Sequence, residues 1–193
     1  MRPFKDYNET PEYTDFKKLP PGAYEVTIIR ADDDKEKNTL CILFEISSGE
    51  FSNYFHEKFA DDKKAFGNTA KFKGVYRLFY PNGGEYDKNS KRKMKTALKL
   101  ICDQNNLSID FTQIWDGALL KGAKIGMIFR DQEWEWDGKF GITAQPYKLI
   151  SLDDLKSGNF TIPEPKLLNN NSSVVPDTND FVNIPDTGED LPF

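Results

Sequence analysis

The chain has 193 residues, 38% of them hydrophobic and 13% aromatic, which suffices for one domain with a buried core and an appendage. Its net charge of −5 comes from residues 161–193, because residues 1–160 hold 25 basic and 25 acidic residues. No stretch approaches the roughly 18 apolar residues of a membrane span, and His56 is the single histidine. We therefore expect a cytoplasmic protein that is not an enzyme, with no cofactor, metal site or membrane contact.

Three strands are predicted in the first third of the chain. Residues 24–28 and 40–46 alternate between apolar and polar side chains, which is the period of a half-buried strand. A turn at 47–49 precedes a third predicted strand over 51–59. These three strands would form an antiparallel meander.

The rest of the chain adds one main helix and a hairpin. Residues 75–80 are predicted as either a strand or part of an insertion, and a helical period follows from about 90 to 105, with a shorter helical turn around 111–120. Strands are predicted around 123–129 and 140–144, joined by a turn at Asp137-Gly138. The order β-β-β-α-β-β predicts a mostly β fold, a five-stranded OB-like barrel over residues 1–160. Cys41 and Cys102 fall in apolar patterns and are predicted to be buried thiols.

The third predicted strand divides its side chains between two faces. Alternation places Phe51, Phe55 and Phe59 on one face and Tyr54, His56 and Lys58 on the other. In an OB barrel the second and third strands hold the ligand, so the second set is a candidate surface for stacking on bases and contacting phosphates. An ordinary solvent-exposed face explains the same pattern.

Basic and aromatic residues also interleave farther along the chain. The candidates there are Lys71, Phe72, Lys73, Tyr76 and Arg77. Tyr76 and Arg77 are adjacent, so they point to opposite sides of a strand and only one of them would contact a ligand. Some of the rings are expected in the core instead.

The predicted main helix begins with several cations, among them Lys91 and Arg92. Positive charge is unfavourable at a helix N-terminus, and a phosphate backbone would turn this repulsion into attraction. A solvated basic face is the alternative interpretation.

Two tryptophans lie in the final hairpin, and their positions depend on its register. We expect a bulged three-residue turn, because it sets Glu135 opposite Lys139 and Trp134 beside Phe140, whereas a two-residue turn sets Glu135 opposite Phe140. Trp134 would then cover the end of the barrel, leaving Trp136 at the tip to stack on a base. The four acidic residues between 131 and 137 argue against a phosphate path at this hairpin.

Residues 161–193 are rich in Pro, Asn, Ser and Asp and are predicted to form a disordered acidic tail. The tail ends in Glu189, Asp190, Leu191, Pro192 and Phe193. This ending resembles the C-terminal tip of bacterial and phage single-stranded-DNA-binding proteins, although that family more often has a run of aspartates and an isoleucine. The resemblance implies that Phe193 enters an apolar pocket of a partner while the acids contact basic residues. The long insertion and helix look more like a phage or mobile-element version.

The residues and the resemblance together predict sequence-tolerant binding and protection of single-stranded DNA during DNA replication, recombination or repair. The tip would recruit replication and recombination proteins, and the protein could act alone or as a homo-oligomer. One alternative is a recombination protein that anneals strands and assembles into rings or filaments. Another is a protein-interaction adaptor whose barrel binds no DNA.

Overall fold

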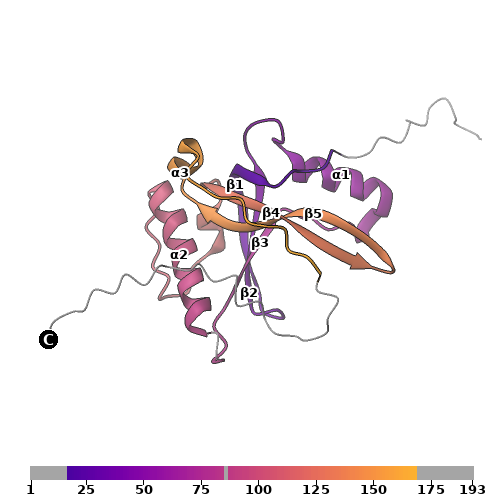
Figure 1. Cartoon of the computed structure of the whole chain (residues 1–193). Coiled ribbons are helices and arrows are strands. Elements are labelled where there is room, and N and C mark those ends of the chain that lie inside the picture. Colours follow the sequence, from indigo (N-terminus) through magenta and orange to yellow (C-terminus); the bar gives the residue numbers. More distant parts are fainter. Residues whose placement is uncertain (1–16, 85–86, 169–193) are drawn as a thin grey trace, which may run out of the picture.

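The computed structural model describes residues 17–84 and 87–168 (Figure 1). Five strands form an antiparallel sheet in the spatial order β3-β2-β1-β4-β5, which confirms a mostly β fold with five strands. The elements along the chain are β1 (Gly22–Asp34), β2 (Thr39–Ile46), α1 (Tyr54–Phe66), β3 (Val75–Phe79), α2 (Asp87–Asn105), β4 (Lys124–Trp136), β5 (Lys139–Ile150) and α3 (Leu152–Ser157), with short 3-10 turns at Gly67–Thr69 and Gly117–Leu120. The main helix predicted from about 90 to 105 corresponds to α2.

Strand β1 pairs with two neighbours over different parts of its length. Its first part, from Gly22 to Thr27, pairs with β4, and the part from Val26 to Asp34 pairs with β2. The register with β2 shifts between Ile28 and Arg30, so one extra residue forms a β-bulge there. Bulges bend and twist a strand, and this bend lets β1 serve both halves of the sheet.

The sheet in the structure is open. Its edge strands are β3 and β5, and no hydrogen-bonded ladder joins them within the described residues. The two edges do contact each other, and Tyr147 of β5 lies near enough to Tyr76 of β3 to influence its titration.

The strand predicted over 51–59 is wrong, because this segment leads into and forms the first part of α1. The third strand of the meander is β3, in the region that the sequence left as either strand or insertion. The error has a specific cause. Phe51, Phe55 and Phe59 recur at every fourth residue, and this spacing fits two strand periods as well as one helical turn.

A carboxylate from β2 stabilises the helix. Glu45 is buried and accepts hydrogen bonds from the backbone N–H groups of Phe55 (3.0 Å) and His56 (2.7 Å), and it also contacts the His56 ring. The first N–H groups of a helix lack partners inside the helix, and the side chain of Asn53 at the helix start makes no capping hydrogen bond. Glu45 therefore caps α1 from another element, which the local sequence does not reveal.

The register predicted for the final hairpin is also wrong. Trp136 pairs with Lys139 and Glu135 pairs with Phe140, so the turn has two residues. Asp137 and Gly138 both have positive φ, 50° and 69°. Such a turn matches the twist of the two strands, and this outweighs the charge pairing that favoured the bulged turn.

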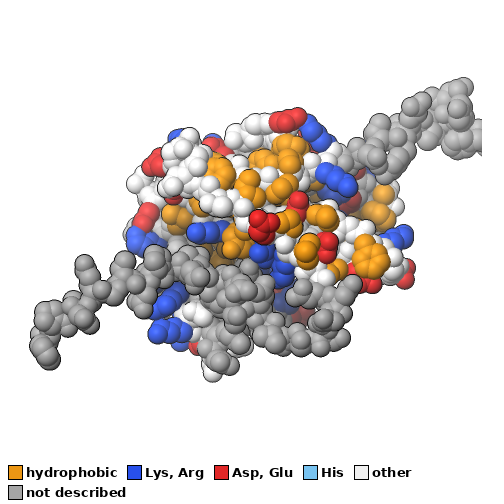
Figure 2. Space-filling model, viewed as in Figure 1, with side chains coloured by type: hydrophobic (Ala, Val, Ile, Leu, Met, Phe, Trp, Pro, Cys, Tyr) orange, Lys and Arg blue, Asp and Glu red, His pale blue; other side chains and the backbone are white. Residues whose placement is uncertain are grey.

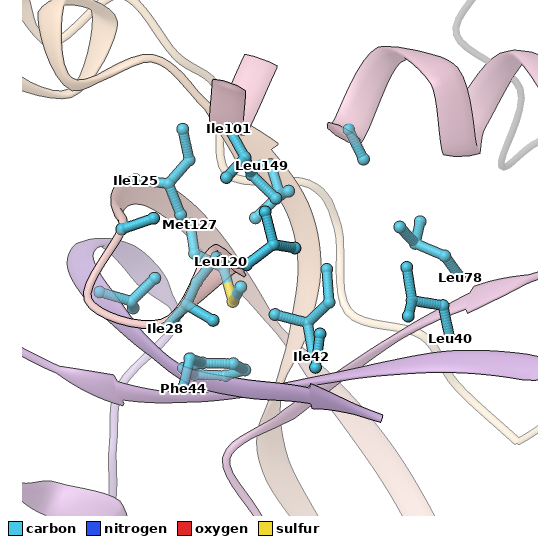
Figure 3. Close-up of a cluster of buried hydrophobic side chains, with 14 of the residues drawn as sticks. Ile28, Leu40, Ile42, Phe44, Leu78, Ile101, Leu120, Ile125, Met127 and Leu149 are labelled. Atoms are coloured by element: carbon cyan, nitrogen blue, oxygen red, sulfur yellow. The ribbon is translucent and has the colours of Figure 1, made fainter. Parts of the chain in front are cut away.

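The hydrophobic core lies between the inner face of the sheet and α2 (Figure 3). Ala97, Leu98, Ile101 and Cys102 form the buried face of α2, at the helical spacing that the sequence predicted. Phe55 of α1 closes another side of the core, with its ring centroid 5.3 Å from that of Phe44. The strands and the 3-10 turn supply the fully buried side chains Val26, Ile28, Ile42, Phe44, Ile46, Leu120, Ile125, Met127 and Phe129.

Both cysteines, Cys41 and Cys102, are buried and free, as predicted. In the described part of the chain, no helix combines the length and the apolar character that crossing a membrane requires.

Candidate nucleic-acid interface

The three residues predicted on one face of a strand are distributed around α1. Tyr54 is half-buried against the core, and its hydroxyl oxygen accepts a hydrogen bond from the N–H of Leu19 at 3.2 Å. His56 is exposed but contacts Glu45, and Lys58 lies 3.3 Å from Asp62. Tyr54 and Lys58 are four residues apart and lie on one side of the helix, whereas His56 is two residues from each and faces elsewhere, so this structure does not bring the three together as a binding surface.

The candidate residues in the segment before β3 differ in their burial. Phe72 is half-buried against the core and contacts the rings of Phe55, His56 and Phe59. Lys71 and Lys73 are exposed, and Lys73 lies 3.4 Å from Asp62. The ring therefore has a packing role, while the two lysines flank it on the surface.

Tyr76 and Arg77 lie on opposite sides of β3, as their adjacency predicted. Tyr76 packs against the core, and burial, followed by the influence of Tyr147, raises its pKa to about 12. Arg77 is exposed on the outer face, so Arg77 is the residue of this pair that can contact a ligand.

The outer face of β1, β2 and β3 carries a small basic and aromatic surface around Arg77. Arg77 pairs with Cys41 of β2, which pairs in turn with Asp32 of β1. Arg30 lies 2.8 Å from Asp32, and Phe79 is 62% exposed two residues beyond Arg77 on the same face. We call Arg30, Arg77 and Phe79 the sheet-face surface. Phe79 is not among the candidates that the sequence singled out.

The cations at the start of α2 are partly neutralised. Asp87 lies in the first turn of the helix, and its carboxylate is 3.2 Å from the amine of Lys91. Arg92 is exposed. The helix thus has an acid at its N-terminus after all, and the predicted conflict with the helix dipole is smaller than the sequence suggested.

In the described part of the chain, the β4–β5 hairpin exposes several aromatic rings and projects beyond the rest of the sheet (Figure 1). Trp136 is 75% exposed beside the turn. Trp134 is 41% exposed, and its ring covers Gly141 on the neighbouring strand so closely that a Cβ there would lie 2.6 Å from a ring carbon. Because glycine leaves this space open, the Trp134 ring lies across the hairpin rather than over the end of the core.

The hairpin separates its charges between two faces. Strand alternation places Arg130, Trp134 and Trp136 on the side opposite to the core residues of β4. The acids Asp131, Glu133 and Glu135 all fall on the other side, together with Phe140 and Ile142 of β5. The acids therefore do not occupy the face that carries the tryptophans.

We call Arg130, Trp134, Trp136 and Lys139 the tryptophan face. Lys139 belongs to this face because it is paired with Trp136, and the guanidinium carbon of Arg130 lies 4.6 Å from the centroid of the Tyr147 ring. Alternation from 130 to 136 was readable in the sequence, but only the register assigns Lys139 to this side. In the view of Figure 2, apolar surface gathers around the hairpin with charged side chains among it.

The first residues of the predicted tail lie along this hairpin. Lys166 forms a parallel bridge with Gln132, and its N–H donates to the carbonyl oxygen of Asp131 at 2.8 Å. Its own carbonyl oxygen accepts from the N–H of Glu133 at 2.9 Å. The N–H of Leu168 donates to the carboxylate of Glu133 at 3.0 Å, so the last described residues lie beside the acidic side of the hairpin. The predicted partner-binding residues 189–193 lie outside the described residues.

Among the residues that the structure describes, no group of three His, Cys, Asp or Glu side chains could hold a metal ion. No protein-family model and no curated protein matches the sequence of this chain. The chain's own residues are therefore the basis for assigning a function.

Proposed function

We propose that the protein binds single-stranded DNA without sequence preference and makes or breaks no covalent bond. The observation that carries this proposal is the tryptophan face, where two exposed indole rings share one side of the hairpin with Arg130 and Lys139 while Asp131, Glu133 and Glu135 occupy the opposite side. Non-specific single-strand binding combines rings that stack on bases with cations that follow the backbone. Trp is enriched at interfaces, and neighbouring exposed apolar side chains often mark a binding site.

The arrangement of strands supports an OB-like barrel for this chain. With β3 in the third position, three antiparallel strands, then α2, then a hairpin follow one another, and α1 is an insertion between the second and third strands. The bulged strand β1 is shared by both halves of the sheet, and the edges β3 and β5 contact each other. OB folds bind oligonucleotides on the face of the second and third strands and with the loops that join the first to the second and the fourth to the fifth strand. In this chain those regions are the sheet-face surface, the β1–β2 turn and the β4–β5 hairpin.

The proposal predicts a distinctive salt dependence. A strand that stacks on the tryptophan face and passes the cations of the sheet-face surface would neutralise about four phosphates, so log affinity should fall with log salt with a slope near −3. Each stacked base should contribute about 1 to 3 kcal/mol. The expected affinity is therefore moderate for short strands and should increase with length until the surface is filled.

The experiment is fluorescence anisotropy of labelled single- and double-stranded oligonucleotides, titrated with the full chain at two salt concentrations. We expect salt-sensitive binding that prefers the single strand, and a loss of about 5- to 150-fold in affinity for Trp136→Ala. Phe66→Ala removes a ring of similar exposure (65%) from the end of α1 and serves as the matched control. Equal binding of duplex, or a Trp136→Ala protein that binds as tightly as the parent, would contradict the proposal.

We also propose that the C-terminal tip recruits proteins of DNA replication, recombination or repair. The support is the sequence alone, with its acids followed by an apolar tip at residues 189–193. A purified candidate partner should bind the full chain but not a chain that lacks these five residues, while DNA affinity should not weaken. A partner that binds both chains equally would refute this role.

One structural feature favours a second candidate, the adaptor. The acidic side of the hairpin also exposes Phe140 (68%) and Ile142, and acid beside apolar surface suits a protein partner. In that case Phe140→Ala should abolish partner binding, and Trp136→Ala should change nothing.

A further inference from the structure

A half-open pocket of about 320 Å³ lies where the β1–β2 turn, the end of β3, the turn at 81–84 and the first turn of α2 meet. The elements that meet there lie at the opposite end of β3 from α1 and away from the projecting hairpin (Figure 1). Its lining residues are Lys37, Asn38, Phe79, Tyr80, Asn82, Gly84 and Ser90. Its volume is at the lower end of the range for small-ligand sites.

The walls of this pocket are held in place by hydrogen bonds. The N–H of Tyr80 donates to the carbonyl oxygen of Asn38 (2.9 Å), and the Asn38 side-chain amide donates to the carbonyl oxygen of Tyr80 (3.0 Å). On the other side, the Asp87 carboxylate accepts from the N–H groups of Asn82 (2.6 Å) and Gly83 (3.1 Å). A ligand would therefore enter a preformed site and would not have to order these loops.

The chemistry of the lining suits a nucleobase better than a phosphate. Phe79 offers an exposed ring, and neither the side-chain N–H groups of Asn82 nor the hydroxyl of Ser90 has a hydrogen-bond partner among the described residues. Lys37, the one cation of the lining, is already paired within its own turn at 3.3 Å. Amides and hydroxyls recognise base edges, and aromatic rings stack on base faces.

The pocket is continuous with the sheet-face surface along β3. Arg77 and Phe79 are two residues apart on the outer face of β3. A single-stranded DNA that contacts Arg77 therefore reaches Phe79 within the spacing of one nucleotide. The phosphate of such a nucleotide would lie toward Arg77 while its base turns into the pocket.

We propose that this pocket holds one unstacked base of the bound single strand, with Phe79 stacked on the base and Asn82 and Ser90 at its edge. This inference rests on the proposed function and deepens it by assigning a separate base subsite. The subsite lies at the β1–β2 end of the sheet, apart from the tryptophan face. The two would hold different nucleotides of the same strand.

The test compares two probes of equal length, an oligothymidylate of about 16 nucleotides, the upper site size of one OB fold, and an abasic oligomer with the same backbone. Both are titrated by anisotropy against the full chain, Phe79→Ala, Ser90→Ala and the control Phe66→Ala. We expect Phe79→Ala to weaken binding of the oligothymidylate by about 5- to 150-fold and to leave binding of the abasic oligomer unchanged. Ser90→Ala should show the same selectivity with a smaller loss, and Phe66→Ala should affect neither probe.

The outcomes separate this inference from the proposed function. If Phe79→Ala weakens both probes equally, or neither, the base subsite is refuted, while salt-sensitive preference of the parent for single strands keeps the proposed function intact. If the parent binds neither probe more tightly than duplex, the proposed function fails and the subsite fails with it. Thermal unfolding of each variant shows whether it is folded, and a Phe79→Leu protein supplies a ring-free side chain of similar size should the alanine variant unfold.

Discussion

Replacing Gly141 by alanine would displace Trp134 without changing the tryptophan itself. An added Cβ would lie 2.6 Å from Cζ2 and 2.7 Å from Cε2 of the indole, closer than such atoms approach in real structures, so the ring must move. Trp134 is on the exposed hairpin and can rotate into solvent, so we expect the free energy of unfolding to change by no more than about 0.5 kcal/mol. If the ring stacks on a base, its displacement should cost about 1 to 3 kcal/mol of binding, or roughly 5- to 150-fold in affinity.

The assay pairs tryptophan emission with anisotropy titrations of a single-stranded oligonucleotide. The emission of Gly141→Ala should shift to the red as the indole enters water, and affinity should fall to the level of Trp134→Ala. Thr143→Ala is the control, because Thr143 is exposed on the same strand and pairs with Gln132 rather than with Trp134. A red shift without loss of affinity would show that the position of the Trp134 ring does not matter for binding, and would refute this part of the tryptophan face.

Glu45→Ala should lower the free energy of unfolding by roughly 2 to 4 kcal/mol, because two N–H groups at the start of α1 lose their acceptor. Chemical denaturation measures this loss of stability. An equal loss for Glu36→Ala, which removes an exposed carboxylate, would contradict the capping role of Glu45. Deleting residues 169–193, which hold five acids and no cation, should tighten DNA binding at low salt and less so at high salt, whereas unchanged or weaker binding would contradict competition by the tail. The hydrogen bond from Lys124 holds the pKa of Glu25 below its ordinary value of 4.5. The stability that this hydrogen bond provides is present above pH 4.5 and is lost as the pH falls through the lowered pKa of Glu25. In pH-dependent denaturation, Glu25→Gln should therefore lose less stability between neutral and acid pH than the parent. Parallel curves for the two proteins would show that the Glu25–Lys124 interaction contributes nothing to this pH dependence.

Much of the fold could be predicted because it depends on local periodicity. Apolar alternation identified β1, β2, β4 and β5, and the spacing of Ala97, Leu98, Ile101 and Cys102 identified α2. These patterns succeed because one face of each element is buried, so the period of the element is written into the sequence. The candidate site was predicted less well. Arg77 and Trp136 are exposed as expected, whereas Tyr54, Phe72 and Tyr76 pack against the core.

The failures come from contacts between residues that are distant in the sequence. A spacing of four between phenylalanines permits both a strand and a helix, and Glu45 of β2 favours the helix by capping α1. The hairpin register rests on left-handed backbone at Asp137 and Gly138 and on the space that Gly141 leaves for Trp134.

The sequence by itself determined which segments are amphipathic, where the negative charge is concentrated, and that rings and cations lie together. These are properties of single residues and their spacing. Only the tertiary structure decided which rings are buried and which, like Phe79 and Trp136, remain exposed, because burial depends on what packs from the other side of the molecule. It also placed Lys139 on the same face as the two tryptophans of the hairpin, since the pairing of two strands fixes which side chains share a face.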